Sequence, residues 1–161
     1  MTGVAGDSVS RAASKRSALL AIAAGGGIAG ALDLTQACIL FGTRVPFGVA
    51  AGLLGPEAAR QGGAGTYALG VFLHFFIAFS AATIYYTASR WLGFLAQYPL
   101  VCGLFFGAAV EVFMSYIVLP LSALHARGPY ELNEVLLGFG VHMVIVGLPI
   151  SFSVWRFARS A

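Results

Sequence analysis

The sequence predicts an all-α integral membrane protein, folded as a bundle of four membrane-spanning helices. Of its 161 residues, 59% are apolar and only 9% are charged, whereas about a quarter of the residues in a soluble domain are charged. The mean hydropathy is +0.88. So few charges cannot cover a surface that faces water. The composition therefore excludes a soluble enzyme, a disordered protein and a groove-reading nucleic-acid binder, and it makes the lipid bilayer the expected partner.

Four apolar segments are long enough to cross about 30 Å of hydrocarbon as helices. These predicted spans comprise residues 17–42, 66–88, 99–122 and 135–157. Because lipid offers the backbone no hydrogen-bond partner, segments of this length are expected to be helical. Residues 17–161 then form one transmembrane domain, and residues 1–16 are expected to be a mobile cytoplasmic tail that precedes a retained first span.

The connection at residues 43–65 is unusually apolar for a loop. Its first half predicts a short interfacial or re-entrant helix with Pro46 in the first turn, where the missing N–H is tolerated. Glu57 and Arg60 are spaced to pair at i,i+3. A lid over the bundle and a loop that lies on the membrane are both consistent with this segment.

The positions of Lys and Arg predict the orientation of the chain. One side carries six of them, Arg11, Lys15, Arg16, Arg90, Arg156 and Arg159. The other side carries three, Arg44, Arg60 and Arg127. The positive-inside rule then predicts that both termini lie on the cytoplasmic side of a bacterial inner membrane. The same side is expected to carry an interfacial aromatic belt formed by Tyr85, Tyr86, Trp91 and Trp155.

Each predicted span contains one ionisable residue in its interior: Asp33, His74, Glu111 and His142. A charged group at a helix centre costs about 2.5–3.5 kcal/mol on insertion scales, so such residues are rare. Counted from the outer ends of the spans at 1.5 Å per residue, all four lie about 10–17 Å deep. The sequence therefore predicts one buried polar layer.

Glycines precede these residues on the same helical stripe, as expected where membrane helices approach closely. The glycines are Gly26, Gly30, Gly70, Gly103, Gly107 and Gly138. The four polar side chains are therefore predicted to point into the bundle. Residues 69–77 and 137–145 also share the pattern LGxxxHxxI, which suggests two parallel hairpins related by a pseudo-two-fold axis along the membrane normal.

Three kinds of chemistry suit such a layer. Two imidazoles and two carboxylates could ligate Zn, Mn or Fe, although the ExxH spacing common in helix-bundle metal sites is absent. Carboxylates and imidazoles also relay protons or ions near neutral pH. His74 and His142 could alternatively be axial ligands of a haem in a redox protein, with Asp33 and Glu111 as unfavourable neighbours of the ring.

A purely structural interpretation stands beside these. Asp33–His74 and Glu111–His142 would then be packing pairs that fix helix register, in a structural or assembly subunit of a larger membrane complex. Secondary candidates that extend the layer are Thr35, Gln36, Ser115 and Tyr116, and His125 is a candidate metal ligand in the outer loop. The glycine-rich faces suggest a homodimer or partner subunits.

The sequence contains no Walker loop, GxSxG or HExxH motif, so a non-enzymatic function is expected. Cys38 and Cys102 lie within apolar segments and form no CxxC motif, which indicates small buried side chains.

Residues 52–75, from GLLG to LHF, and residues 116–122, YIVLPLS, resemble a bacterial inner-membrane protein family of about four spans and unknown function. That resemblance implies topology and location, and it implies no activity.

Overall fold

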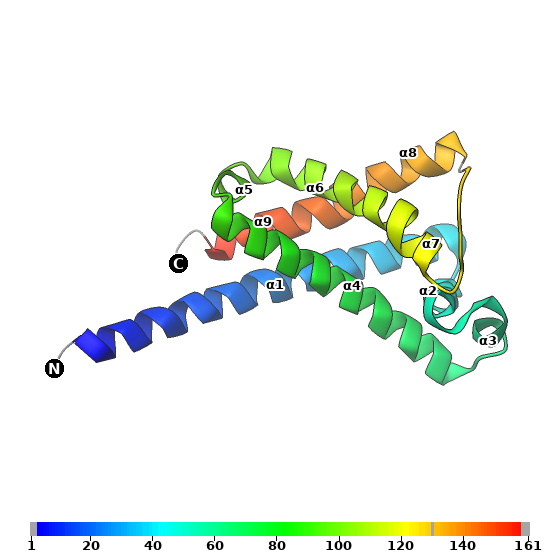
Figure 1. The fold of residues 1–161 in the computed structure, drawn as a ribbon, viewed down its shortest axis with the longest axis horizontal. Helices are drawn as coiled ribbons and strands as arrows, with labels where there is room; N and C mark the ends of the chain where they lie inside the picture. Colours follow the sequence, from blue (N-terminus) through cyan, green and yellow to red (C-terminus); the bar gives the residue numbers. More distant parts are fainter. Residues whose placement is uncertain (1–2, 130, 159–161) are drawn as a thin grey trace.

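The computed structural model describes residues 3–129 and 131–158, and these are helical apart from short connections. The first two spans are α1 (Gly3–Phe41) and α4 (Ala64–Trp91). The third comprises α6 (Pro99–Phe113), η1 (Met114–Val118) and α7 (Leu119–Leu121), and the fourth comprises α8 (Leu132–Val141), η2 (His142–Gly147) and α9 (Leu148–Ala158). The connections carry α2 (Val45–Leu54), α3 (Pro56–Arg60) and α5 (Phe94–Gln97) (Figure 1).

Four helices are long and apolar enough to cross a membrane, so the chain is a multi-pass membrane protein. They are Ser14–Phe41, Ala64–Trp91, Pro99–Leu121 and Leu132–Phe157. The predicted spans agree with these boundaries to within three residues, as for residue 17 against Ser14. Helix α1 begins at Gly3, so it also covers most of the segment for which a tail was expected.

The four spans pack chiefly as two hairpins joined through α9. Helix α1 packs against α4 and α9, and α6 packs against η2 and α9. The start of α1 and the end of α9 lie at one end of the bundle, whereas α2, α3 and α7 lie at the other (Figure 1). Helix α2 packs along α4, at the end of the bundle away from the start of α1 (Figure 1).

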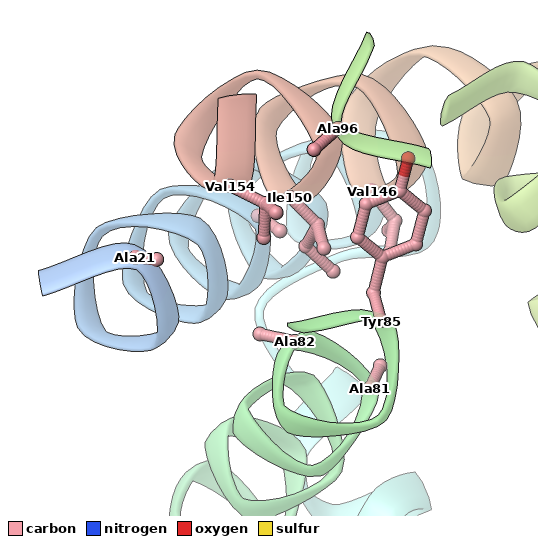
Figure 2. Packing of buried hydrophobic residues seen from close by; sticks show 9 residues of the cluster. Ala21, Ala81, Ala82, Tyr85, Ala96, Val146, Ile150 and Val154 are labelled. Atoms are coloured by element: carbon pink, nitrogen blue, oxygen red, sulfur yellow. The ribbon is translucent and has the colours of Figure 1, made fainter. Parts of the chain in front are cut away.

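The interior is built mainly from small side chains. Its buried cluster comprises Ala21, Ala29, Ala81, Ala82, Tyr85, Ala96, Val146, Ile150 and Val154 (Figure 2). Small residues allow membrane helices to approach closely. Tyr85 is 1% exposed and its hydroxyl donates to the carbonyl of Leu95 at 2.9 Å. The prediction that Tyr85 belongs to an interfacial belt was therefore wrong, because its hydroxyl finds a partner on α5 inside the bundle.

Glycines set the contact between α6 and the fourth span. A Cβ atom at Gly107 would collide with the carbonyl of His142, and one at Gly103 with the hydroxyl of Ser151. A Cβ at Gly147 would meet the carbonyl of Gly103. The two backbones therefore touch along this stripe, as the glycine spacing predicts.

The third and fourth spans each contain one π-helical turn. Each of these turns, η1 and η2, ends two residues before a proline, Pro120 or Pro149. Proline has no backbone N–H to donate a hydrogen bond to the carbonyl four residues earlier, and its ring clashes with that carbonyl. A switch to i→i+5 bonding in the preceding turn relieves this conflict, and such turns occur frequently at functional sites. His142 is the first residue of η2.

Helix α2 is fixed at both ends. Pro46 lies in its first turn, as predicted, and its carbonyl contacts α4 at Gly70, where a Cβ atom would not fit. At the other end Gly55 adopts a positive φ of 87°, and Pro56 cannot supply an N–H to the carbonyl of Gly52. The backbone N–H of Ala123 donates to that carbonyl instead, at 2.8 Å. This bond ties α2 to the loop after α7.

The predicted pair between Glu57 and Arg60 forms as a hydrogen-bonded ion pair. Both side chains are well exposed, so the pair contributes little to stability.

Substitution of Gly107 tests the close packing of α6 against η2. We expect Gly107→Ala to lower the free energy of unfolding in detergent by about 1–3 kcal/mol, because a methyl group there forces the two backbones apart. Gly140→Ala on α8 is the matched control, since nothing lies within 4 Å of the added Cβ. Denaturant titration followed by circular dichroism measures both, and equal stabilities would contradict the packing.

Candidate functional site

Glu111 of α6 and His142 of η2 form the closest carboxylate–histidine contact. Glu111 Oε2 lies 2.8 Å from His142 Nδ1. The carboxylate fits because Gly138, one turn before His142, has no side chain, and a Cβ atom there would press on the Glu111 carboxyl group. Ser115 Oγ donates to the other oxygen, Glu111 Oε1, at 2.9 Å. The carboxylate is thus held from both sides.

The partners of His142 determine which ring nitrogen carries the hydrogen. Nδ1 also lies 3.0 Å from the carbonyl oxygen of Gly138. A carbonyl only accepts, so Nδ1 must be the N–H that donates to it and to Glu111. In the neutral ring, Nε2 is then a bare acceptor. The arrangement of hydroxyl, carboxylate and imidazole therefore leaves one basic nitrogen for other partners.

Asp33 of α1 and His74 of α4 form a looser contact. His74 Nε2–H donates to the backbone carbonyl of Gly30 at 2.9 Å. Asp33 Oδ2 lies 3.9 Å from the same nitrogen, which is too far for a hydrogen bond. The ring of His74 also meets Phe75 edge-on, with centroids 5.7 Å apart. Of the two pairs anticipated from the sequence, Glu111–His142 is therefore hydrogen-bonded directly and Asp33–His74 is not.

A cavity of about 790 Å³ joins the two pairs. Asp33, His74 and His142 line it, and the rest of its wall is mostly apolar. Helix α2 contributes Gly48, and the loop after α7 contributes Leu124. The four ionisable side chains are at most 22% exposed.

The four predicted layer residues do not converge on one point. In the described part of the chain, no three His, Cys, Asp or Glu side chains lie close enough together to hold a metal ion. The hydrogen bond from Nε2 of His74 to the carbonyl of Gly30 leaves Nδ1 as the only nitrogen of that ring that could bind a haem iron. The layer therefore consists of one hydrogen-bonded pair, Glu111–His142, and one looser contact, Asp33–His74, beside a shared cavity.

The secondary candidates differ in their environment. Ser115 contacts Glu111, Tyr116 is 62% exposed, and Gln36 is half-buried. Thr35 is exposed on α1. His125 is exposed in the loop between α7 and α8, with a positive φ of 49°.

Sequence reasoning missed the carbonyls of Gly30 and Gly138 and the wall that α2 supplies. Pro120 and Pro149 were the available signals for the widened turns beside Glu111 and His142.

Comparison of the chain with family models, with curated proteins and with solved structures found no match. The functional argument therefore rests on the cavity and its two pairs.

Double-mutant cycles test the unequal strength of the two contacts. For Glu111→Ala with His142→Ala we expect a coupling free energy of about 1–3 kcal/mol, because the direct bond is lost in either single variant. For Asp33→Asn with His74→Gln we expect less than about 0.5 kcal/mol, because these side chains are not hydrogen-bonded. The measurement is equilibrium unfolding in micelles.

Glu134→Gln with His125→Gln serves as the control cycle, since both residues are exposed. Equal coupling in the two site cycles, or none between Glu111 and His142, would contradict the geometry.

Proposed function

We propose that this chain is a bacterial inner-membrane protein that exchanges protons between its two carboxylate–histidine pairs across the shared cavity. One observation carries the proposal: Asp33, His74 and His142 line a single cavity, while Glu111 binds the nitrogen of His142 that carries its hydrogen. The Lys and Arg distribution supports cytoplasmic termini, which would put the cavity in the outer half of the bundle.

His142 is the central group in this proposal. A hydronium ion in the cavity transfers a proton to Nε2: one of its O–H bonds breaks and leaves neutral water, an N–H bond forms, and the ring gains one positive charge. The Glu111 carboxylate, 2.8 Å from Nδ1, offsets that charge. Ser115 holds the carboxylate by its second oxygen, so the charge can develop without a rearrangement of the pair.

Asp33 is the complementary acceptor. Its carboxylate lies in the wall of the same cavity and makes no hydrogen bond to a donor in the described residues. A proton that leaves His142 Nε2 through cavity water can therefore bind to an Asp33 oxygen, which returns the imidazole to its neutral form. His74, 3.9 Å from Asp33, stabilises the ionised carboxylate whenever its own ring is protonated.

In the metal interpretation, the hydrogen bond between His142 and Glu111 would orient His142 as a metal ligand. Histidine ligands commonly donate their second N–H to a carboxylate, as His142 does to Glu111. The proton interpretation is favoured here because it needs one basic nitrogen and one carboxylate on the cavity wall, and these are present.

A structural role is the second candidate, favoured by the Glu111–His142 bond itself. That bond joins α6 to η2 next to the Gly107 contact, and it would fix helix register without any proton exchange. The two functions make different predictions for Asp33, whose carboxylate lines the cavity and lies too far from His74 for a hydrogen bond between the helices.

Proton flux into liposomes tests the proposal. The purified chain is reconstituted around an internal pH-sensitive dye, and a potassium diffusion potential drives protons inward. We expect a flux above that of protein-free liposomes, lowered about tenfold or more by His142→Gln and by Asp33→Asn, since each removes a proton-binding group. His125→Gln, in the outer loop, should leave the flux unchanged.

Circular dichroism and gel filtration establish that each variant is folded before its flux is compared. A wild-type flux no higher than that of empty liposomes would exclude the relay. Full flux in folded Asp33→Asn and His142→Gln variants would exclude it equally and would leave the structural role.

A further inference from the structure

The shared cavity is large enough for a small organic molecule. Its volume of about 790 Å³ falls within the range of about 300–1,000 Å³ that is usual for ligand sites. Such sites combine mostly apolar walls with a few convergent polar groups. Here the apolar wall comes from all four spans and α2, and the polar groups are Asp33, His74 and His142.

The rim of the cavity is apolar and exposed. Phe41, Leu53 and Phe76 line it and are 70%, 61% and 60% exposed. These residues belong to the end of α1, to α2 and to the middle of α4, in or beside the membrane-spanning segments. A molecule that enters past them passes over apolar surface, so the route favours a lipophilic compound that is dissolved in the bilayer.

The polar groups of the cavity offer acceptors more than donors. Asp33 has two carboxylate oxygens with no hydrogen-bond donor in the described residues, and the hydrogen on His74 Nε2 is taken by Gly30. His142 has its hydrogen on Nδ1, directed to Glu111 and Gly138, so Nε2 is an acceptor. A carboxylate in this position is costly within a membrane unless a partner neutralises it.

We propose that the cavity binds a lipophilic ammonium compound, with its apolar body against the cavity wall and its charged nitrogen at Asp33. The ammonium group supplies both the positive charge that offsets the Asp33 carboxylate and the N–H that Asp33 or His142 Nε2 can accept. An anion of the same shape would be repelled by the Asp33 carboxylate. A neutral molecule would leave the charge of that carboxylate without a counter-ion.

This inference rests on the proposed function, because the ligand uses the same acceptors as the protons. His74 of α4 lies 3.9 Å from Asp33, and His142 of η2 lines the same cavity, with its Nδ1 bonded to Glu111 of α6. Helix α2 carries no titratable residue, and the described part of α9 carries only Arg156, near its end. Protons on the three cavity groups therefore compete with the ammonium ion, and its binding should release protons and strengthen as the pH rises.

A matched set of cage compounds tests the ligand class. Adamantanamine, adamantanol and adamantanecarboxylate share one apolar body and carry a positive, a neutral and a negative head. Binding to the full chain in nanodiscs of zwitterionic lipid is measured by isothermal titration calorimetry. We expect the amine to bind about tenfold or more tightly than the alcohol, and the carboxylate to bind most weakly.

Two variants locate the site. Asp33→Asn should remove the preference for the amine over the alcohol, while Glu134→Gln, exposed on α8, should keep it. Gly48→Leu is the second variant, because Gly48 lines the cavity and nothing lies within 4 Å of a Cβ added there. The new side chain should fill part of the cavity without disturbing the fold. It should therefore lower the affinity of every compound of the set that binds the unaltered chain.

The possible outcomes separate this inference from the proton relay. Amine preference that is lost in Asp33→Asn supports the ammonium site, whether or not the liposomes show proton flux. Equal binding of the three compounds, tighter binding of the carboxylate, or an unchanged preference in folded Asp33→Asn overturns the ammonium site. If proton flux is present in that case, the proposed function stands without this ligand.

Discussion

The hydrogen bond between Glu111 and His142 depends on backbone contacts that only glycine permits. Gly107 lets α6 touch the backbone of η2 at His142, and Gly138 leaves room for the Glu111 carboxylate. Once the helices are this close, Nδ1 of His142 is fixed between Glu111 and the Gly138 carbonyl. The remaining nitrogen is then free for the cavity. Close helix packing thus determines which atom of His142 is available for chemistry.

Much of the fold could be predicted from the sequence, because the strongest constraint acts on single segments. Lipid requires each span to satisfy its own backbone, so hydropathy alone locates all four spans and Pro46 marks the start of α2. Tyr85 was misplaced because an aromatic residue near a span end is compatible with either an interface or an interior hydrogen bond. The π-helical turns depend on how Pro120 and Pro149 are accommodated after packing.

The candidate site was predictable in part. The packing pairs named in the structural interpretation are found, with Asp33 near His74 and Glu111 bonded to His142. Counting residues along a helix gives depth in the membrane, however, and says nothing about the lateral distance between helices. The sequence therefore could not distinguish one four-residue cluster from two pairs separated by a cavity. The internal repeat and the cytoplasmic location of the termini stay predictions.

The tautomers of the histidines test the account most directly. Nitrogen-15 NMR of protein labelled at its histidine rings, recorded at a pH where the rings are neutral, distinguishes a protonated ring nitrogen from a bare one. The account predicts opposite tautomers, with the hydrogen on Nδ1 in His142 and on Nε2 in His74. His142→Gln and His74→Gln spectra assign the signals, and the exposed His125 provides an internal reference. A hydrogen on Nε2 of neutral His142 would contradict the account, because the cavity would then lose its basic nitrogen.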